Sequence, residues 1–197
     1  MAYFERLWSE LPDMQPEHFE RRRGFLLAAL QPGAKVLDVG CGSGWFSEAL
    51  AGAGFATVGV DVADEAIRRA RARCPELEFQ LAAEGGELPF APESFDAAWL
   101  GEVLEHVQDG LGLLAAVERV LVAGGQLLVS TPDHGRALRL RLGLSRRAFE
   151  RHFEPRSDHV RFFTRRTLRE LIDAADYREI EIRARRGSLF ASSRAAR

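Results

Sequence analysis

The sequence predicts an α/β fold with a mostly parallel seven-strand sheet and helices on both faces. Short apolar runs alternate with amphipathic segments along most of the chain, a pattern typical of consecutive βαβ units. The runs VLDV, VGV and LLVS are almost unbroken, as expected of parallel strands that are buried on both faces. Two segments of alternating hydrophobicity at the C-terminal end predict an antiparallel hairpin at the edge of the sheet.

The first two thirds of the chain supply the alternating elements. Residues 16–30 are expected to form a helix, because Pro16 suits a first helical position and four apolar residues share one face. Asp64 is a plausible cap of its helix, and Gly124-Gly125 are expected to end another. In chain order, the elements after the first helix are strand 34–40, helix 43–54, strand 55–61, helix 64–74, strand 76–82, strand 94–100, helix 109–121 and strand 126–131.

Beyond Pro132 the pattern changes. One amphipathic helix is expected within residues 136–153, and a second helix over 164–175 has Thr164 as its N-cap. Residues 177–184 and 188–195 are the two strands of the expected hairpin.

Composition narrows the class of protein. The 197 residues are 46% hydrophobic and 28% charged, which indicates a globular protein of one domain and excludes a disordered or collagen-like chain. No uncharged apolar run approaches the ~18–20 residues of a membrane-spanning helix, and the first residues lack the apolar core of a signal peptide. Cys41 and Cys74 are read as reduced thiols, so a cytoplasmic location is expected.

Charge is unevenly distributed along the chain. Residues 1–135 carry 10 basic and 21 acidic side chains, whereas residues 136–197 carry 17 basic and 8 acidic ones. Such asymmetry points to an anionic partner for the C-terminal part, although charged residues that only cover a solvated face would give the same count.

A glycine-rich turn follows the first predicted strand. The segment DVGCGSG (38–44) places Gly40, Gly42 and Gly44 where a strand ends and a helix begins, so the backbone can approach a ligand closely. In an open α/β sheet, ligands bind outside the carboxyl ends of the strands. Asp61 ends the second strand, where its carboxylate can accept hydrogen bonds from both ribose hydroxyls of an adenosine.

Two classes of cofactor share these features. Dinucleotide-binding proteins carry G-x-G-x-x-G, whose third glycine permits close packing of helix and strand. Here the bulky Trp45 stands at that third position, which disfavours a pyrophosphate across the turn. The turn better suits an adenosine with a short, non-phosphorylated tail, such as S-adenosylmethionine. A nicotinamide-dependent oxidoreductase remains the less favoured alternative, as does a non-catalytic module that only binds the cofactor.

The motifs carry a resemblance to a known family. VLDVGCGSGWFS (36–47) is similar to motif I of class I S-adenosylmethionine-dependent methyltransferases. The later segments GVDVADEAI, ELPFAPESFDAAWLGEVLEHV and ERVLVAGGQLLVSTP resemble the type-11 branch, which includes ubiquinone and menaquinone biosynthesis methyltransferases. HVRFFTRRTLRELIDAADY (159–177) extends the resemblance, which spans roughly residues 33–184. It implies a Rossmann-like class I methyltransferase fold, with S-adenosylmethionine converted to S-adenosylhomocysteine.

The resemblance also implies roles for individual residues. Asp38 would orient the turn and the methionine amino group, Asp61 would hold the ribose, and Val62 would lie against the adenine. The glycine turn would wrap the methionine moiety, through Gly40, Cys41, Gly42 and Gly44. The remaining implied contacts are Glu84 and Gly85 at the adenine amino group and the backbone of Leu100 and Gly101 at the methionine end.

The same resemblance divides the domain of residues 1–197 into four parts. Residues 1–32 form an N-terminal helical segment, a candidate lid whose side chains could equally pack onto the sheet. Residues 33–132 form the cofactor-binding core, 133–160 a helical insert that caps the substrate, and 161–197 the C-terminal helix and hairpin.

Methyl transfer itself requires few chemical groups. The enzyme has to hold the nucleophile near the methyl carbon in a dry pocket, and a base assists only when the nucleophile must lose a proton. His106, just after the fourth strand, is the first candidate for proton acceptor. Glu102, His134 and His159 are alternatives, and no metal site is expected.

The insert is rich in arginine. Its basic residues are Arg136, Arg139, Arg141, Arg146, Arg147, Arg151 and Arg156. Such a segment could cap a small substrate, clamp an anionic or lipid-linked substrate while contacting a membrane surface, or be a solvated face. The absence of interleaved aromatic and basic residues on a strand argues against nucleic acid as a partner.

Overall fold

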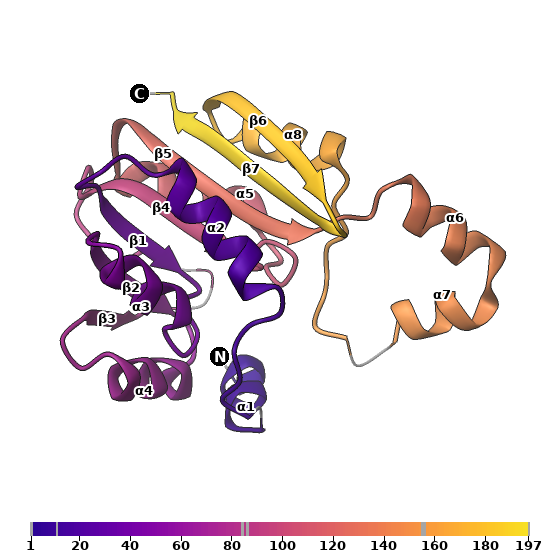
Figure 1. Ribbon diagram of the computed structural model, residues 1–197, viewed down its shortest axis with the longest axis horizontal. Coiled ribbons are helices and arrows are strands. Elements are labelled where there is room, and N and C mark those ends of the chain that lie inside the picture. Colours follow the sequence, from indigo (N-terminus) through magenta and orange to yellow (C-terminus); the bar gives the residue numbers. More distant parts are fainter. Residues whose placement is uncertain (1, 11, 84, 86, 155–156, 197) are drawn as a thin grey trace.

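One seven-strand sheet organises the described residues, which are 2–10, 12–83, 85, 87–154 and 157–196 of this computed structural model. The strands are β1 (Lys35–Val39), β2 (Ala56–Asp61), β3 (Glu78–Leu81), β4 (Phe95–Gly101), β5 (Leu121–Pro132), β6 (Tyr177–Arg185) and β7 (Ser188–Ala195). The helices are α1 (Ala2–Glu10), α2 (Phe19–Ala29), α3 (Trp45–Gly52), α4 (Asp64–Arg73), α5 (Gly110–Val120), α6 (Arg136–Leu144), α7 (Arg146–His152) and α8 (Arg165–Ala174). Across the sheet the order is β3-β2-β1-β4-β5-β7-β6 (Figure 1).

The strand directions confirm a mostly parallel sheet with one antiparallel strand. β1 pairs in parallel with β2 and β4, and the pairs β2–β3 and β4–β5 are also parallel. β7 runs antiparallel to both β5 and β6, so the predicted hairpin forms one edge of the sheet. The chain order reverses between β1 and β4, so the carboxyl ends of these strands form the topological switch point where ligands bind in open α/β sheets.

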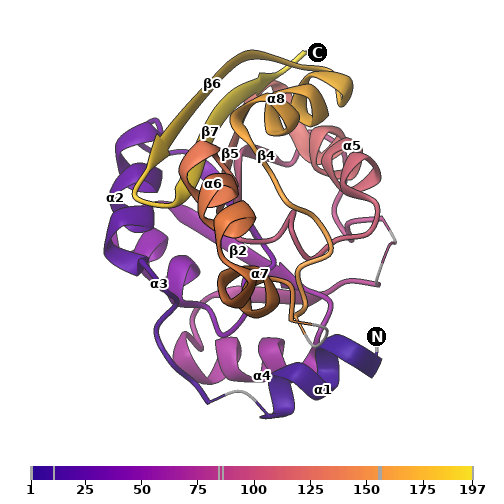
Figure 2. The same cartoon turned by 90° about the vertical axis from the view of Figure 1, so that its right-hand side faces the viewer.

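Helices cover both faces of the sheet, with α2 and α3 on one face and α5 and α8 on the other (Figure 2). Alternate residues of β4 pack into the two layers, as the period of a strand requires. Ala97 and Trp99 belong to the core beside α2 and α3, whereas Ala98 and Leu100 belong to the core beside α5 and α8. This double burial explains why the parallel strands are apolar almost without interruption.

The prediction that Gly124-Gly125 end a helix was wrong. α5 starts after Asp109, whose carboxylate accepts a hydrogen bond from Gly112 N at 2.9 Å, and it ends at Val120. Leu121 already pairs with Phe95 of β4, and the register then shifts along β4. Gly124, with φ of 68°, therefore lies in the irregular first part of β5. Pairing with a neighbouring strand outweighs the local glycine signal.

The two predicted helix caps have different outcomes. Asp64 is the first residue of α4 and no cap, since the N-cap position is Ala63, which makes no side-chain capping bond. Thr164 does cap α8: its hydroxyl accepts from Thr167 N, and the Thr167 hydroxyl accepts from Thr164 N.

The insert after β5 contains two helices instead of the single predicted one. α6 and α7 are separated by Ser145, whose backbone is extended and whose hydroxyl accepts from Ala148 N at 3.2 Å. Both helices stand away from the sheet, beyond the carboxyl end of β5 (Figures 1 and 2). Neither contains a buried residue.

The cysteines and helix lengths agree with the sequence expectations. Cys41 and Cys74 are both buried and are free thiols. Every helix in the described part of the chain is too short or too polar to cross a bilayer.

Candidate functional site

The glycine turn joins β1 to α3 at the switch point of the sheet. Gly40, Gly42 and Gly44 all have positive φ, of 68°, 54° and 84°, a region that other residues enter only with strain. A Cβ at Gly40 would lie 2.6 Å from Val103 Cγ2, and one at Gly42 would lie 2.7 Å from Trp8 Cη2. Both conformation and close approach therefore require glycine in this turn.

Asp61 ties the turn to the end of β2. Its Oδ2 accepts a hydrogen bond from Gly42 N at 2.9 Å, and its Oδ1 accepts from Ala63 N at 3.0 Å. The carboxylate is 8% exposed, and burial raises its pKa. Each carboxylate oxygen can accept a further hydrogen bond, so the group can still take ribose hydroxyls as donors.

Asp38 lies beneath the same turn. Its Oδ2 accepts a hydrogen bond from the Ser47 hydroxyl at 2.6 Å, so the first turn of α3 holds the carboxyl in place. Burial raises the pKa of Asp38 to about 7, and the nearby carboxylate of Asp61 adds to the effect. Asp38 and Asp61 thus form a pair of buried acids around the glycine turn.

The other predicted cofactor contacts lie in or near this end of the sheet. Cys41 is buried within the turn, Val62 is half-buried after β2, and Leu100 and Gly101 form the end of β4 with the Leu100 side chain in the core. Gly85 is exposed in a turn with φ of 66°, and Glu84 lies outside the described residues.

The N-terminal helix covers the glycine turn. α1 packs beside α4 and contributes Trp8, whose indole lies against Gly42. Arg69 of α4 donates a hydrogen bond to Trp8 O at 2.8 Å, and Arg73 forms an ion pair with Asp13 at 2.8 Å. The Trp8 indole therefore lies over the turn and not in the core clusters that flank the sheet.

A second polar cluster follows β4, beside the turn. Glu102 has φ of 61°, unusual for a residue other than glycine, and its Oε1 accepts from the Ser130 hydroxyl at 2.8 Å. Arg22 of α2 donates from Nε to the same hydroxyl at 3.1 Å and lies 3.8 Å from Glu102 Oε1. No pattern in the sequence indicates this role of Arg22, because its partner is 108 residues away along the chain.

Glu105 is the most buried acid of this cluster. Its side chain is fully buried, and Oε2 accepts from the Thr131 hydroxyl at 3.0 Å. Burial, reinforced by Glu102, raises the pKa of Glu105 to about 8, so its carboxyl is mostly protonated at neutral pH. A protonated Glu105 can donate to Glu102, which leaves Arg22 and Glu102 as the charged pair.

Two of the candidate histidines meet beside this cluster. His106 Nδ1 lies 3.2 Å from Asp158 Oδ2, and the His106 and His159 rings are in edge contact, with centroids 4.8 Å apart. Within the described residues, Glu105, His106 and His159 also bring one potential metal-ligating atom each to within 4.8 Å of one another. The raised pKa of Glu105 means that this group of one carboxyl and two imidazoles carries little negative charge at neutral pH.

His134 has a separate environment. It is 7% exposed after β5, and its Nε2 lies 3.1 Å from Nε2 of His152 in α7. Burial and the neighbouring His152 lower the pKa of His134. This candidate from the sequence therefore joins the core to the insert and is not part of the cluster after β4.

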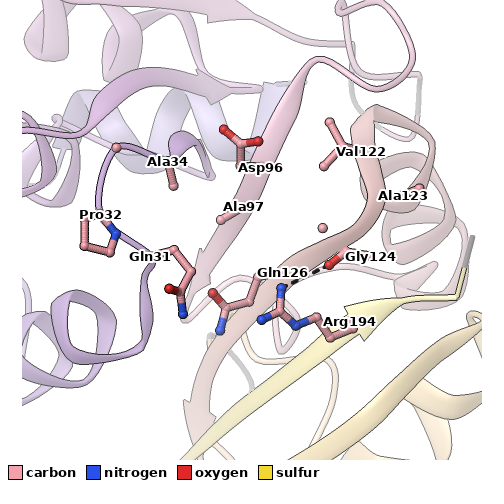
Figure 3. Close-up of a pocket in the computed structure, with 12 residues that line it drawn as sticks. Gln31, Pro32, Ala34, Asp96, Ala97, Val122, Ala123, Gly124, Gln126 and Arg194 are labelled. Carbon is pink, nitrogen blue, oxygen red and sulfur yellow. Dashed lines mark hydrogen bonds between the residues drawn. The ribbon is translucent and has the colours of Figure 1, made fainter.

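A cavity of about 400 Å³ lies at the opposite end of the sheet (Figure 3). Gln31, Gln126 and Arg194 point toward one another along one side of it, and Arg194 Nη1 donates to Gly124 O at 3.1 Å. The cavity borders the first residues of β4 and the irregular start of β5. It contains none of the residues predicted to bind the cofactor.

Comparison with known proteins identifies the family of this chain. Residues 13–182 match the family model described as methyltransferase domain. The chain belongs to this methyltransferase family. This membership favours a methyltransferase over the nicotinamide-dependent alternative that the glycine turn left open.

Individual relatives cover part of the chain. The ubiquinone biosynthesis O-methyltransferase of Xanthomonas campestris pv. campestris (strain B100) is 42% identical over 110 residues, 51% of this chain and 44% of the relative. The demethylmenaquinone methyltransferase of Tropheryma whipplei (strain Twist) is 33% identical over 134 residues, 68% of this chain and 56% of the relative. The chain thus spans about half the length of the curated relatives it matches.

Solved structures share the fold. A protein from Pyrococcus horikoshii has a TM-score of 0.74 at 22% identity, over 98% of this chain and 99% of its own. Phosphoethanolamine N-methyltransferase 2 of Haemonchus contortus, solved with S-adenosyl-L-methionine, has a TM-score of 0.74 at 15% identity, over 98% of this chain and 56% of its own. These likenesses confirm the Rossmann-like class I methyltransferase fold.

Replacement of Gly40 tests whether the Val103 side chain packs directly against the glycine turn. Gly40→Ala should lower the free energy of unfolding by about 1–2 kcal/mol for its left-handed backbone and by about 1–3 kcal/mol more for the clash with Val103. Gly33→Ala is the matched control, because Gly33 has φ of 80° but open space around it. Urea denaturation measures both variants. Equal losses would contradict the close approach, whereas adding Val103→Ala to Gly40→Ala should recover part of the difference.

The buried acid Asp38 makes stability depend on pH. Its folded pKa of about 7 exceeds the ordinary value of 3.8, so the folded chain binds this proton more tightly than the unfolded chain. The stabilisation is complete below pH 4 and is lost as pH rises from about 4 to about 7, at up to ~1.4 kcal/mol per pH unit.

We therefore expect Asp38→Asn to lose less stability than the natural chain between these pH values, as measured by urea denaturation. Ser47→Ala removes the bond that lowers this pKa, so its loss of stability should extend to higher pH. Identical pH dependence for Asp38→Asn and the natural chain would refute the assignment.

Proposed function

We propose that this protein transfers a methyl group from S-adenosylmethionine to a small-molecule or lipid-linked acceptor, at oxygen, carbon or nitrogen. The observation that carries the proposal is the glycine turn held by Asp61 at the switch point, in a member of a methyltransferase family. When bound, S-adenosylmethionine supplies an electrophilic methyl on a sulfonium that leaves as a neutral thioether.

The residues of the turn fit such a cofactor. Asp61 keeps free acceptor positions for the ribose hydroxyls, and Asp38 lies beneath the turn that would hold the methionine amino group. Val62 would lie against the adenine, with Glu84 and Gly85 near its amino group. The Leu100-Gly101 backbone would meet the methionine end, with Gly40, Cys41, Gly42 and Gly44 around the same moiety.

α1 has the position of a lid in this proposal. Trp8 lies on the glycine turn, and hydrogen bonds from α4 hold the helix there. An indole over the turn excludes water from the cofactor, which suits a displacement that competes with hydrolysis.

We assign proton acceptance to His106. Its Nδ1 lies within hydrogen-bond distance of the Asp158 carboxylate, so Asp158 fixes the ring and leaves Nε2 as the acceptor. Asp158 is then a positioning residue, and the sequence alone gave no reason to pair it with His106. Glu102, also at the end of β4, is the alternative acceptor.

The insert supplies the acceptor side of the site. α6 and α7 carry exposed apolar residues among their arginines, with 64% of Leu140 and 79% of Leu144 exposed. An amphipathic basic surface of this kind binds anionic membranes. Together with relatives named for ubiquinone and menaquinone synthesis, it supports a phenol- or quinone-type acceptor reached from a membrane surface.

Removal of the Asp61 carboxylate tests cofactor binding. Asp61→Ala should weaken the binding of S-adenosylmethionine by about 10–150-fold, because the ribose hydroxyls lose a charged acceptor worth ~1.5–3 kcal/mol. Calorimetric titration measures the affinity, with Asp64→Ala on the exposed start of α4 as the control that keeps it. Unchanged affinity in a folded Asp61→Ala protein would contradict the assignment of Asp61 to the cofactor site.

Turnover tests the role of His106. With a panel of phenols and prenylated phenols as acceptors, His106→Asn should slow formation of S-adenosylhomocysteine by about 10²–10⁴-fold without changing cofactor affinity. Asp158→Asn should have a smaller effect and shift the pH profile, and His18→Asn at an exposed position is the control. An unchanged rate in His106→Asn would move the role to Glu102. Cofactor binding without turnover of any acceptor would favour a non-catalytic module.

A further inference from the structure

A cavity of about 380 Å³ lies within the insert, between α6 and α7. Its lining residues are Arg141, Ser145, Arg147, Ala148, Arg151 and His152. Among the described residues, the lining thus contains three guanidinium groups, an imidazole and a hydroxyl, and it contains no carboxylate.

The helical spacing explains why these side chains converge. Arg147 and Arg151 are four residues apart on α7, so they share one face of that helix, and Arg141 approaches from α6. The neighbouring Glu150 pairs instead with Arg146 at 2.7 Å. The insert therefore has a neutralised pair that does not line the cavity and three cations that do.

Three like charges around one cavity repel one another, and an anion bound among them would relieve this repulsion. Guanidinium groups bind phosphate oxygens through paired hydrogen bonds, which are stronger than those between neutral groups. The volume lies in the range of ordinary small-ligand pockets and exceeds the needs of a single carboxylate.

We propose that this cavity is a binding site for a phosphate or diphosphate group, carried either by a free phosphorylated ligand or by a lipid headgroup. The site does not rest on the proposed methyl transfer, because it is defined by the insert alone.

The cavity is also tied to the core. His152 at its wall lies 3.1 Å from buried His134, measured between Nε2 atoms, and the His134 and Phe162 rings are 5.0 Å apart. The insert stands at the carboxyl end of the sheet, so an anion bound there is anchored on the same side as the glycine turn (Figure 2).

The test compares two double variants of equal charge. Arg147→Gln with Arg151→Gln removes two lining cations, whereas Arg136→Gln with Arg139→Gln removes two cations of the same insert that do not line the cavity. Both arginines of the test pair are exposed on the helix surface, and circular dichroism with thermal melting verifies that each variant is folded.

The first arm is calorimetric titration with pyrophosphate and with inorganic phosphate at fixed ionic strength. We expect saturable binding of pyrophosphate that weakens at least 10-fold in the lining variant and less than twofold in the control variant. The second arm is cosedimentation with vesicles of phosphatidylcholine, with and without phosphatidylglycerol. Lining-dependent binding to the phosphatidylglycerol vesicles alone would support the site and identify its ligand as a headgroup.

Two results would overturn the proposal. If the natural chain binds neither phosphate, pyrophosphate nor phosphatidylglycerol vesicles, the cavity is no anion site. If both double variants lose affinity equally, the insert attracts anions only through its net charge. Either result leaves the titration of S-adenosylmethionine unchanged, so failure here is distinguishable from failure of the methyltransferase proposal.

Discussion

The burial of Asp61 at the end of β2 is the constraint on which the site depends. Its carboxylate bonds to backbone N–H groups on both sides, one in the turn after β1 and one before α4. This arrangement holds two adjacent loops in one geometry, and it places a charge where solvent is excluded. Backbone donors compensate part of the desolvation cost, and the raised pKa measures the part that is left.

The same desolvation cost applies to other carboxyl groups at the switch point. Asp38 in β1 and Glu105 after β4 are buried as well, Glu102 beside them is half-buried, and Arg22 is the buried cation described next to them. A protein keeps such an excess of carboxyl groups in its interior only if something offsets the repulsion. Protonation of Glu105 and Asp38 offsets part of it in the free protein. A ligand with positive charges, such as a sulfonium and an amino group, would offset the rest.

The sequence predicted those parts of the fold that local pattern determines. Apolar runs located the strands, and the glycines of DVGCGSG located the turn, because positive φ and close approach admit no other residue at Gly40 or Gly42. Prediction failed where distant partners decide. Leu121 is extended because it pairs with Phe95. The break between α6 and α7 has local signals instead, since Gly143 lies in the last turn of α6 and the Ser145 hydroxyl caps α7. The hydrogen-bond partners of the site residues could not be predicted for the same reason, because they are distant along the chain.

Hydrogen bonds at the base of the insert link the arginine-rich insert to the loop after β4, which carries the acidic cluster. Val160 N and Arg161 N both donate to Glu105 O, and Arg161 Nε donates to Val107 O, so the returning chain of the insert is bonded along this loop. His106 lies within that loop and meets Asp158 from the same returning chain. The His106–Asp158 pair therefore lies where the chain of the insert returns to the loop after β4. The backbone hydrogen bonds that hold this returning chain are consequently placed to orient the proposed proton acceptor as well.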